Sequence, residues 1–264
     1  MITIGSKSKE TIEGPIYESV KVNGEFISND LSYMRGHGTY LDEGAEFIKS
    51  NLCGQVESVG KLIIVHPLNS RYKGNTGDVV VGRVMEVVPK KWMIDVQGEQ
   101  LGQLMLTSIG LPDGVQRRKT EEDELQMRTY FKEFDIVVAE VQQINMNGTI
   151  NLQTRNERYG KMSNGVLVKV NPNLVQTCPS HFLELGGDTS IVLGKNGFIW
   201  IQGTNIPVQS LLFNILKVMD SKNISISDQS LQLAIGFCKV KENPLLYTRT
   251  AKGIEEVSKF LSQQ

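Results

Sequence analysis

Five short apolar segments between residues 77 and 155 constrain the fold of this chain more than any other feature. The first of them alternates apolar and polar residues with the period of two that is typical of β-strands. The Asn-Met-Asn-Gly sequence between the last two predicts a hairpin turn. Five short strands, with one long connection between the third and the fourth, predict a small closed barrel of the OB type. The segments read GDVVVGRVMEVV, KKWMIDV, LGQLML, DIVVAEVQQI and TINLQTR.

The long connection, residues 111–134, contains a predicted helix. Thr120 can cap it, and the acidic run from Glu121 to Glu124 falls in its first turn, where the helix dipole favours anions. We therefore interpret the acidic run as helix-start chemistry rather than as a metal site. The apolar residues that follow have the spacing of a core-facing stripe: Leu125, Met127 and Phe131.

A further module is predicted on each side of the barrel. Before it, short apolar segments alternate with glycine-bearing turns and predict a small β domain behind a loose tail of about 15 residues. After it, a strand and the segment SIVLGKNGFIWI precede two helical stretches, at residues 208–220 and 253–264, so the last module is α+β. The expected protein is multidomain and mainly β, with domains at residues 1–76, 77–160 and 161–264.

Composition and charge narrow the class of protein. The net charge of −1 divides into about −1, −3 and +3 over these three domains, which argues against a strong solitary nucleic-acid binder. No apolar run approaches the length of a membrane span, and the N-terminus lacks the apolar region of a secretory signal. Three distant cysteines imply no disulfide framework. We expect a soluble intracellular protein without a membrane partner.

The loop Gly194-Lys195-Asn196-Gly197 has two possible roles. It is no phosphate loop, because it lacks the Gly-Lys-Ser/Thr ending and leads into the β-type run Phe-Ile-Trp-Ile. A GXXG loop of a KH domain would grip the RNA backbone, whereas Asn-Gly is a strong pair for a type I′ turn. We favour the structural hairpin and keep RNA gripping as the alternative.

Basic residues with an aromatic neighbour are the better signal for binding. One cluster falls at the turn between the first two barrel strands, a second in the long connection, and one arginine closes the last strand. In an OB-type barrel these loops flank the oligonucleotide groove, although a solvated charge run is the simpler interpretation. The candidate RNA-binding residues are Lys90, Lys91, Trp92, Arg117, Arg118, Lys119 and Arg155.

The sequence gives little support for a catalytic site or a metal site. Cys178 and His181 have C-x-x-H spacing without a second ligand pair, and His37 and His66 have no catalytic neighbours in the sequence. The carboxylates show no nuclease-like pairing. We expect no enzymatic activity, no metal and no cofactor.

Several long motifs in order resemble one family. The segments GDVVVGRVMEVVPKKWMIDVQ and GTINLQTR resemble an S1-type RNA-binding domain. Together with MRGHGTY, GQVESVGKLIIVHPLNSRYKGNTGD, RYGKMSNGVLV and IVLGKNGFIWI, they resemble the ribosomal RNA-processing protein 4 family of eukaryotic RNA exosome cap subunits. The resemblance covers the chain from about residue 20. It implies an N-terminal β domain, an S1 barrel and a divergent KH domain whose Gly-x-Asn-Gly loop packs against the barrel.

The resemblance also implies a function. Such subunits are non-catalytic, cap a ring of RNase PH-like subunits beside other cap subunits, and guide single-stranded RNA towards a separate 3′-to-5′ exonuclease. The nucleus, nucleolus and cytoplasm are the implied locations. The chain differs from strongly RNA-binding S1 domains at three positions. Those domains carry two phenylalanines and a histidine, which are replaced here by Lys90, Met93 and Met105. RNA contacts should therefore be mostly electrostatic.

The N-terminal domain is the expected ring-docking element. Its glycines would allow close backbone approach, and its polar and aromatic side chains are of types enriched at interfaces. The alternative function is a stand-alone RNA-binding regulator with S1 and KH modules, such as a translation factor. The expected interface residues are Met34, Arg35, Gly36, His37, Gly38, Thr39 and Tyr40.

Overall fold

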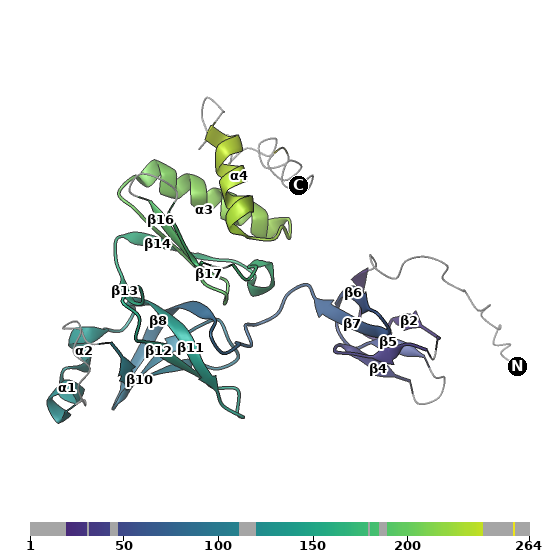
Figure 1. Cartoon of the computed structure of the whole chain (residues 1–264), viewed down its shortest axis with the longest axis horizontal. Coiled ribbons are helices and arrows are strands. Elements are labelled where there is room, and N and C mark those ends of the chain that lie inside the picture. Colours follow the sequence, from purple (N-terminus) through teal and green to yellow (C-terminus); the bar gives the residue numbers. More distant parts are fainter. Residues whose placement is uncertain are drawn as a thin grey trace, which may run out of the picture. The chain divides into compact units, whose positions relative to one another are not determined.

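The computed structural model divides into two compact units, Met1–Asn69 and Ser70–Gln264, and each is described here by itself (Figure 1). The predicted tail of the first 15 residues lies outside the described part, as does the helix predicted at residues 253–264 apart from Glu256. The described residues are 20–30, 32–42, 47–110, 120–178, 180–184, 189–239 and 256.

The smaller unit contains two small sheets. One has the order β1-β6-β7-β3 and the other β2-β5-β4. Alternate residues of the long hairpin β6–β7 point inwards, where they form a core with residues of the second sheet: Ile27, Ile48, Val56, Ile63 and Val65. The strands are β1 (Val20–Lys21), β2 (Phe26–Ser28), β3 (Met34–Arg35), β4 (Thr39–Leu41), β5 (Ile48–Ser50), β6 (Gly54–Val59) and β7 (Leu62–Pro67).

The five predicted barrel strands are present and close on one another. Their order is β12-β10-β9-β8-β11, and an additional pairing of β11 with β12 completes the ring. The pairing of β10 with β12 is parallel and the other pairings in the ring are antiparallel. The prediction of a five-stranded OB-type barrel is confirmed. The strands are β8 (Val79–Val88), β9 (Lys91–Asp95), β10 (Gly102–Ile109), β11 (Ile136–Ile144) and β12 (Ile150–Thr154), with β13 (Gly160–Met162) added beside β11.

The helix predicted in the long connection is broken into α1 (Glu121–Leu125) and α2 (Met127–Tyr130). Thr120 caps α1, with its backbone N–H donating to the Asp123 carboxylate at 2.8 Å. Met127 and Phe131 are buried as predicted, but Leu125 is 87% exposed, so its assignment to the core was wrong. The helix breaks at Gln126, so Leu125 at the end of α1 and Met127 at the start of α2 do not share one apolar stripe, and Leu125 faces solvent.

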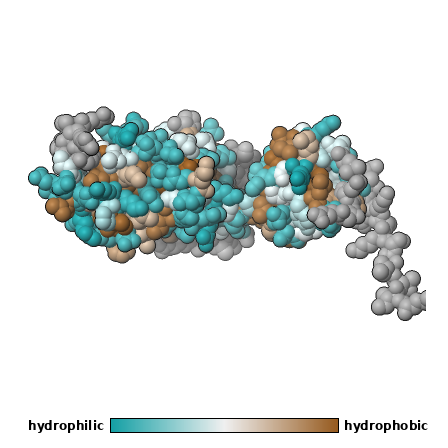
Figure 2. All heavy atoms as spheres, turned by 90° about the horizontal axis from the view of Figure 1, so that it is seen from below, coloured by the Kyte–Doolittle hydropathy of each residue, from teal (hydrophilic) through white to brown (hydrophobic). Residues whose placement is uncertain are grey.

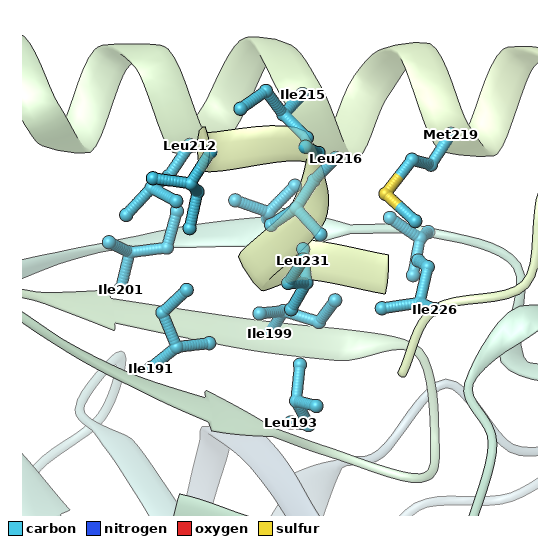
Figure 3. Packing of buried hydrophobic residues seen from close by; sticks show 14 of the residues in the cluster. Ile191, Leu193, Ile199, Ile201, Leu212, Ile215, Leu216, Met219, Ile226 and Leu231 are labelled. Atoms are coloured by element: carbon cyan, nitrogen blue, oxygen red, sulfur yellow. The ribbon is translucent and has the colours of Figure 1, made fainter. Parts of the chain in front are cut away.

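The C-terminal domain is a four-stranded sheet with helices on one face. The sheet has the order β14-β17-β16-β15, and α3 and α4 pack on it around a core of leucine and isoleucine side chains (Figure 3). Sequence reasoning missed α4, although Leu231, Ala234 and Ile235 are buried at helical spacing. The elements are β14 (Gly165–Lys169), β15 (Phe182–Glu184), β16 (Ser190–Leu193), β17 (Phe198–Gln202), α3 (Ile206–Ser221) and α4 (Asp228–Lys239), with a 3₁₀ turn η2 (Pro172–Leu174).

The other face of this sheet packs against the barrel. Along β17, Ile199 and Ile201 face the helices, whereas Phe198 and Trp200 belong to a cluster with Val79, Val81, Ile136 and Val138 of the barrel. A sheet covered on both faces requires continuous apolar strands, which explains the unbroken runs SIVL and FIWI. Barrel and C-terminal domain therefore form one compact unit.

The segment before β8 belongs to the same unit. Tyr72 is buried, its backbone N–H donates to Gln97 at 3.1 Å, and its hydroxyl donates to Asp78 at 2.6 Å. Burial, and then the Asp78 carboxylate, raise the pKa of this tyrosine far above its ordinary value. The domain boundaries proposed from the sequence, at 76/77 and 160/161, stay predictions.

Candidate nucleic-acid interface

The Gly194–Gly197 loop is a β-hairpin loop. It joins β16 to β17, whose nearest paired residues are Leu193 and Ile199. The N–H of Gly194 donates to the Phe198 carbonyl, and the N–H of Gly197 donates to the Gly194 carbonyl, both at 3.0 Å. Gly197 has φ of +81°, whereas Asn196 lies outside the left-handed region, so the turn is not of type I′. The hairpin is confirmed, and the turn type inferred from Asn-Gly was wrong.

Asn196 fastens this loop to the barrel. Its side chain is fully buried, and its Oδ1 accepts from the Val81 N–H at 3.2 Å. Its Nδ2 donates to the carbonyls of Val81 at 2.7 Å and Val96 at 3.0 Å. An amide that bridges β8 and the residue after β9 in this way has no polar atom left for an RNA backbone.

The neighbouring loop residues are also held by protein contacts. The N–H of Lys195 donates to the Val79 carbonyl at 2.9 Å, and its Nζ donates to the Val175 carbonyl at 2.5 Å. A Cβ on Gly194 would lie 2.3 Å from the Phe198 carbonyl oxygen of its own hairpin and 3.0 Å from the Val81 backbone nitrogen of the barrel. In a KH domain that grips RNA, the backbone of the GXXG loop lies against the RNA. Here the loop backbone lies against the barrel instead.

Three of the predicted RNA-binding residues lie at the other end of the barrel. Lys90 lies in the turn between β8 and β9, Lys91 begins β9, and the Lys90 carbonyl accepts from the Leu106 N–H at 2.9 Å. Arg155 directly follows β12, whose Thr154 is paired with Ile109 at the end of β10. The topology therefore brings these three basic residues to one end, and all have exposed or half-buried side chains. The remaining basic cluster lies outside the described residues: Arg117, Arg118 and Lys119.

Trp92 is not part of this surface. It is completely buried in the barrel core, its Nε1 donates to the Phe131 carbonyl at 3.1 Å, and its ring meets that of Phe131 edge-on at 5.3 Å. Strand alternation in β9 turns Trp92 and Ile94 inwards and leaves Lys91 and Met93 outside. The prediction of an RNA contact by Trp92 was wrong, because the inward face of β9 had not been identified.

Methionines occupy the outer face of β9 and β10. Met93 is paired with Gln103, and Met105 is paired with Lys91. Met85 on β8 and Met105 are both exposed by more than 40%. A thioether is apolar and polarisable and makes favourable contacts with aromatic rings, so this face can contact a nucleobase without an aromatic side chain.

A pocket of about 400 Å³ opens beside this face, where the β8–β9 turn meets β10 and α1. The ammonium group of Lys90 lies 3.8 Å from the Glu124 carboxylate at its rim. Sequence reasoning missed the pocket, because only the register of β9 and β10 and the orientation of α1 place its walls together. Its lining residues are Pro89, Lys90, Lys91, Met105, Leu106, Thr107, Thr120, Glu121 and Glu124.

The expected ring-contact segment runs along the edge of the smaller unit's sheet. A Cβ on Gly36 would lie 2.6 Å from the Ile63 carbonyl, and a Cβ on Gly38 would lie 2.7 Å from the Val65 carbonyl. These glycines therefore permit close packing on β7 of their own unit, and the expected contact of the segment with a ring subunit stays a prediction. Thr39 caps the turn, its hydroxyl donating to Gly36 at 2.8 Å. The exposed side chains of the segment are Met34, Arg35, His37 and Tyr40.

An apolar row continues from this segment across the sheet. Met34 is paired with Leu62, and Leu62 with Val59, so the three side chains share the outer face. Met34 and Val59 are both more than half exposed. Apolar residues lie among hydrophilic ones on the face of the smaller unit in Figure 2.

Within the described residues, no group of three or more His, Cys, Asp or Glu side chains is placed to hold a metal ion. None of the helices in that part of the chain has the length and apolarity to cross a membrane.

Comparison with known proteins gives consistent matches. The family model described as "RRP4, S1 domain" matches residues 71–143, and one described as "KH domain" matches residues 165–207. Exosome complex component rrp4 of Schizosaccharomyces pombe is 43% identical over 201 residues, which cover 76% of this chain and 60% of that protein. Exosome complex component RRP4 of Mus musculus is 45% identical over 183 residues, covering 69% and 62%. The Pyrococcus horikoshii Rrp4 is 27% identical, covering 72% of both chains. The chain thus spans about 60% of the length of the first two relatives.

Proposed function

The chain belongs to the RRP4 family of exosome complex components, and from this premise we propose that it is a non-catalytic, RNA-binding cap subunit of an RNA exosome. In this proposal it stabilises a ring of RNase PH-like subunits and guides single-stranded RNA towards a separate 3′-to-5′ exonuclease, in RNA degradation and ribosomal RNA processing. The proposed locations are the nucleus, nucleolus and cytoplasm.

The observation that carries the proposal is the difference between the two ends of the barrel. At one end, Asn196 binds the C-terminal domain to Val81 of β8 and to Val96, the residue after β9. At the other end, Lys90 and Lys91 lie next to the methionine face. The ten residues of β8 separate the ends by about 30 Å. The barrel thus has one end for assembly and another for RNA.

Charge favours a subunit over a stand-alone regulator. The barrel region carries a net charge of about −3 from residue 77 to residue 160, and acidic side chains stand beside its lysines, as in the Lys90–Glu124 pair. Binding to a polyanion gains most of its free energy from phosphate neutralisation, which this barrel supplies weakly by itself. Neighbouring subunits that contribute basic residues to a shared RNA path would compensate for the deficit.

The smaller unit supports docking on the ring. Its segment of residues 34–40 is fixed in place by Gly36 and Gly38, while Met34, Arg35 and Tyr40 project from it with exposed side chains. Arginine and tyrosine are residue types enriched at interface hot spots. A rigid, exposed edge of this kind meets a partner with little loss of conformational entropy.

The test is co-purification of the chain with a reconstituted ring of RNase PH-like subunits. Deletion of residues 1–69, which leaves the larger unit intact from Ser70, should abolish retention on the ring. The double variant Arg35→Glu/Tyr40→Ala should reduce retention at least tenfold. Asn23→Glu places a charge on the exposed turn after β1 and should not affect retention. Retention of the deletion variant, together with nanomolar RNA affinity of the isolated chain at physiological salt, would instead favour the stand-alone regulator.

A further inference from the structure

The pocket between the β8–β9 turn, β10 and α1 has an apolar floor. Pro89, Met105 and Leu106 supply it, and Met105 remains 44% exposed. A volume of about 400 Å³ lies at the lower end of the range for small-ligand pockets and suits a single planar group. Met105 supplies the polarisable contact surface that an aromatic ring prefers.

The rim of the pocket is lined by hydrogen-bond acceptors. Glu121 and Glu124 are three residues apart on α1 and project from the same side of it. This side is held towards the pocket because Asp123, on the opposite side of the helix, is buried and accepts from the N–H of Thr120 and the hydroxyl of Tyr130. The acceptors are therefore positioned before any ligand arrives.

Cations complete the site. Lys90 is held in the left-handed region with φ of +65°, and its exposed ammonium group lies at the rim, 3.8 Å from Glu124. Lys91 lines the same pocket from the start of β9. An exposed ion pair at this distance contributes little free energy. Lys90 can therefore leave the Glu124 carboxylate and pair with an RNA phosphate with little loss of free energy.

We propose that this pocket binds one unstacked base of single-stranded RNA and selects guanine over uracil through Glu121 and Glu124. The inference rests on the proposed RNA-binding function and adds base selectivity to it. A carboxylate only accepts hydrogen bonds, and guanine presents two adjacent donors on its Watson–Crick edge, the ring N1–H and the exocyclic amino group. Uracil presents one N–H between two carbonyl oxygens, which the carboxylates repel. The base lies on Met105 while Lys90 and Lys91 neutralise its flanking phosphates.

The test measures the affinity of the full chain for ten-nucleotide oligouridylates by fluorescence anisotropy at low salt, where electrostatic binding is strongest. The central nucleotide is uridine, guanosine or inosine, which lacks the exocyclic amino group. We expect guanosine to bind about fivefold more tightly than uridine, at the lower end of the discrimination given by a bidentate contact because the pocket is open. Inosine should fall between the two.

The variants separate base selection from overall charge. Glu121→Gln/Glu124→Gln should reduce the guanosine-to-uridine ratio to below twofold. Glu122→Gln, on the same exposed helix but outside the pocket, removes a negative charge and should strengthen both complexes equally without changing the ratio. Near-ultraviolet circular dichroism checks that the variants keep the folded structure.

The outcomes distinguish the two levels of the proposal. Equal affinities for all three oligonucleotides, or a ratio that the double variant leaves unchanged, would overturn the base pocket while leaving RNA binding intact. Failure of the chain to bind any oligonucleotide, even at low salt, would overturn the proposed RNA-binding function itself.

Discussion

Asn196→Ala provides the sharpest test of how the C-terminal domain is held on the barrel. The substitution removes three buried hydrogen bonds, one from the Val81 N–H and two to the carbonyls of Val81 and Val96. Each buried bond contributes about 1 kcal/mol, so the free energy of unfolding should fall by about 3 kcal/mol. For a unit of this size the melting temperature should fall by about 6–12 °C.

The assay combines thermal unfolding with amide hydrogen exchange at Val81. The exchange of this amide should accelerate in Asn196→Ala, because its acceptor is lost while neighbouring ladder amides keep theirs. Asn156→Ala is the matched control, since the exposed Asn156 side chain accepts the Arg158 N–H of its own turn at 3.0 Å. It should change the free energy of unfolding by less than about 0.5 kcal/mol.

A small effect would refute the reasoning. If Asn196→Ala lowered the free energy of unfolding by less than about 1 kcal/mol, with Val81 exchange unchanged, the apolar contacts alone would hold the two domains together. The hydrogen bonds of the loop would then not help to hold the C-terminal domain on the barrel.

Two further predictions concern the barrel. Lys90→Gly should raise the free energy of unfolding by about 1 kcal/mol in urea, because Lys90 has a left-handed backbone, whereas Lys91→Gly in the adjacent strand should lower it. Partial burial raises the pKa of Asp135, but hydrogen bonds from Lys161 and the Lys132 N–H outweigh it and lower the pKa overall. Unfolding therefore takes up a proton at Asp135, and acid favours it. Asp135→Asn should reduce the loss of stability between about pH 5 and pH 3 in urea titrations; an unchanged pH profile would contradict the assignment.

Local patterns in the sequence predicted most of the elements. Three features depend only on residues a few positions apart, so they could be predicted from the sequence. They are the strands β8 to β12, the acidic first turn of α1 and the turns signalled by Asn-Gly. The resemblance to the RRP4 family placed these elements in an S1 barrel and a KH domain, in agreement with the family matches. The helix α4 was missed although its signal was present at Leu231 and Ala234.

The site depended more on contacts between distant parts of the chain. Alternation along β9 shows that Trp92 and Met93 face opposite sides, yet only closure of the barrel decides that Trp92 points inwards to the Phe131 carbonyl. In the same way, the break at Gln126 decided that Leu125 is exposed. A periodic pattern defines two faces of an element, and the choice between them requires its packing partners.

The sequence by itself favoured a hairpin at residues 194–197 over an RNA-gripping loop, because glycine and asparagine have local preferences for turns. Only the tertiary structure decided what the hairpin does. The partners of Asn196 are 115 and 100 residues away along the chain, and the pocket unites a turn, a strand and a helix that no single stretch contains. Hydrogen bonds and cavities depend on distances in space, which arise only when the strands have closed and the sheet has packed on the barrel.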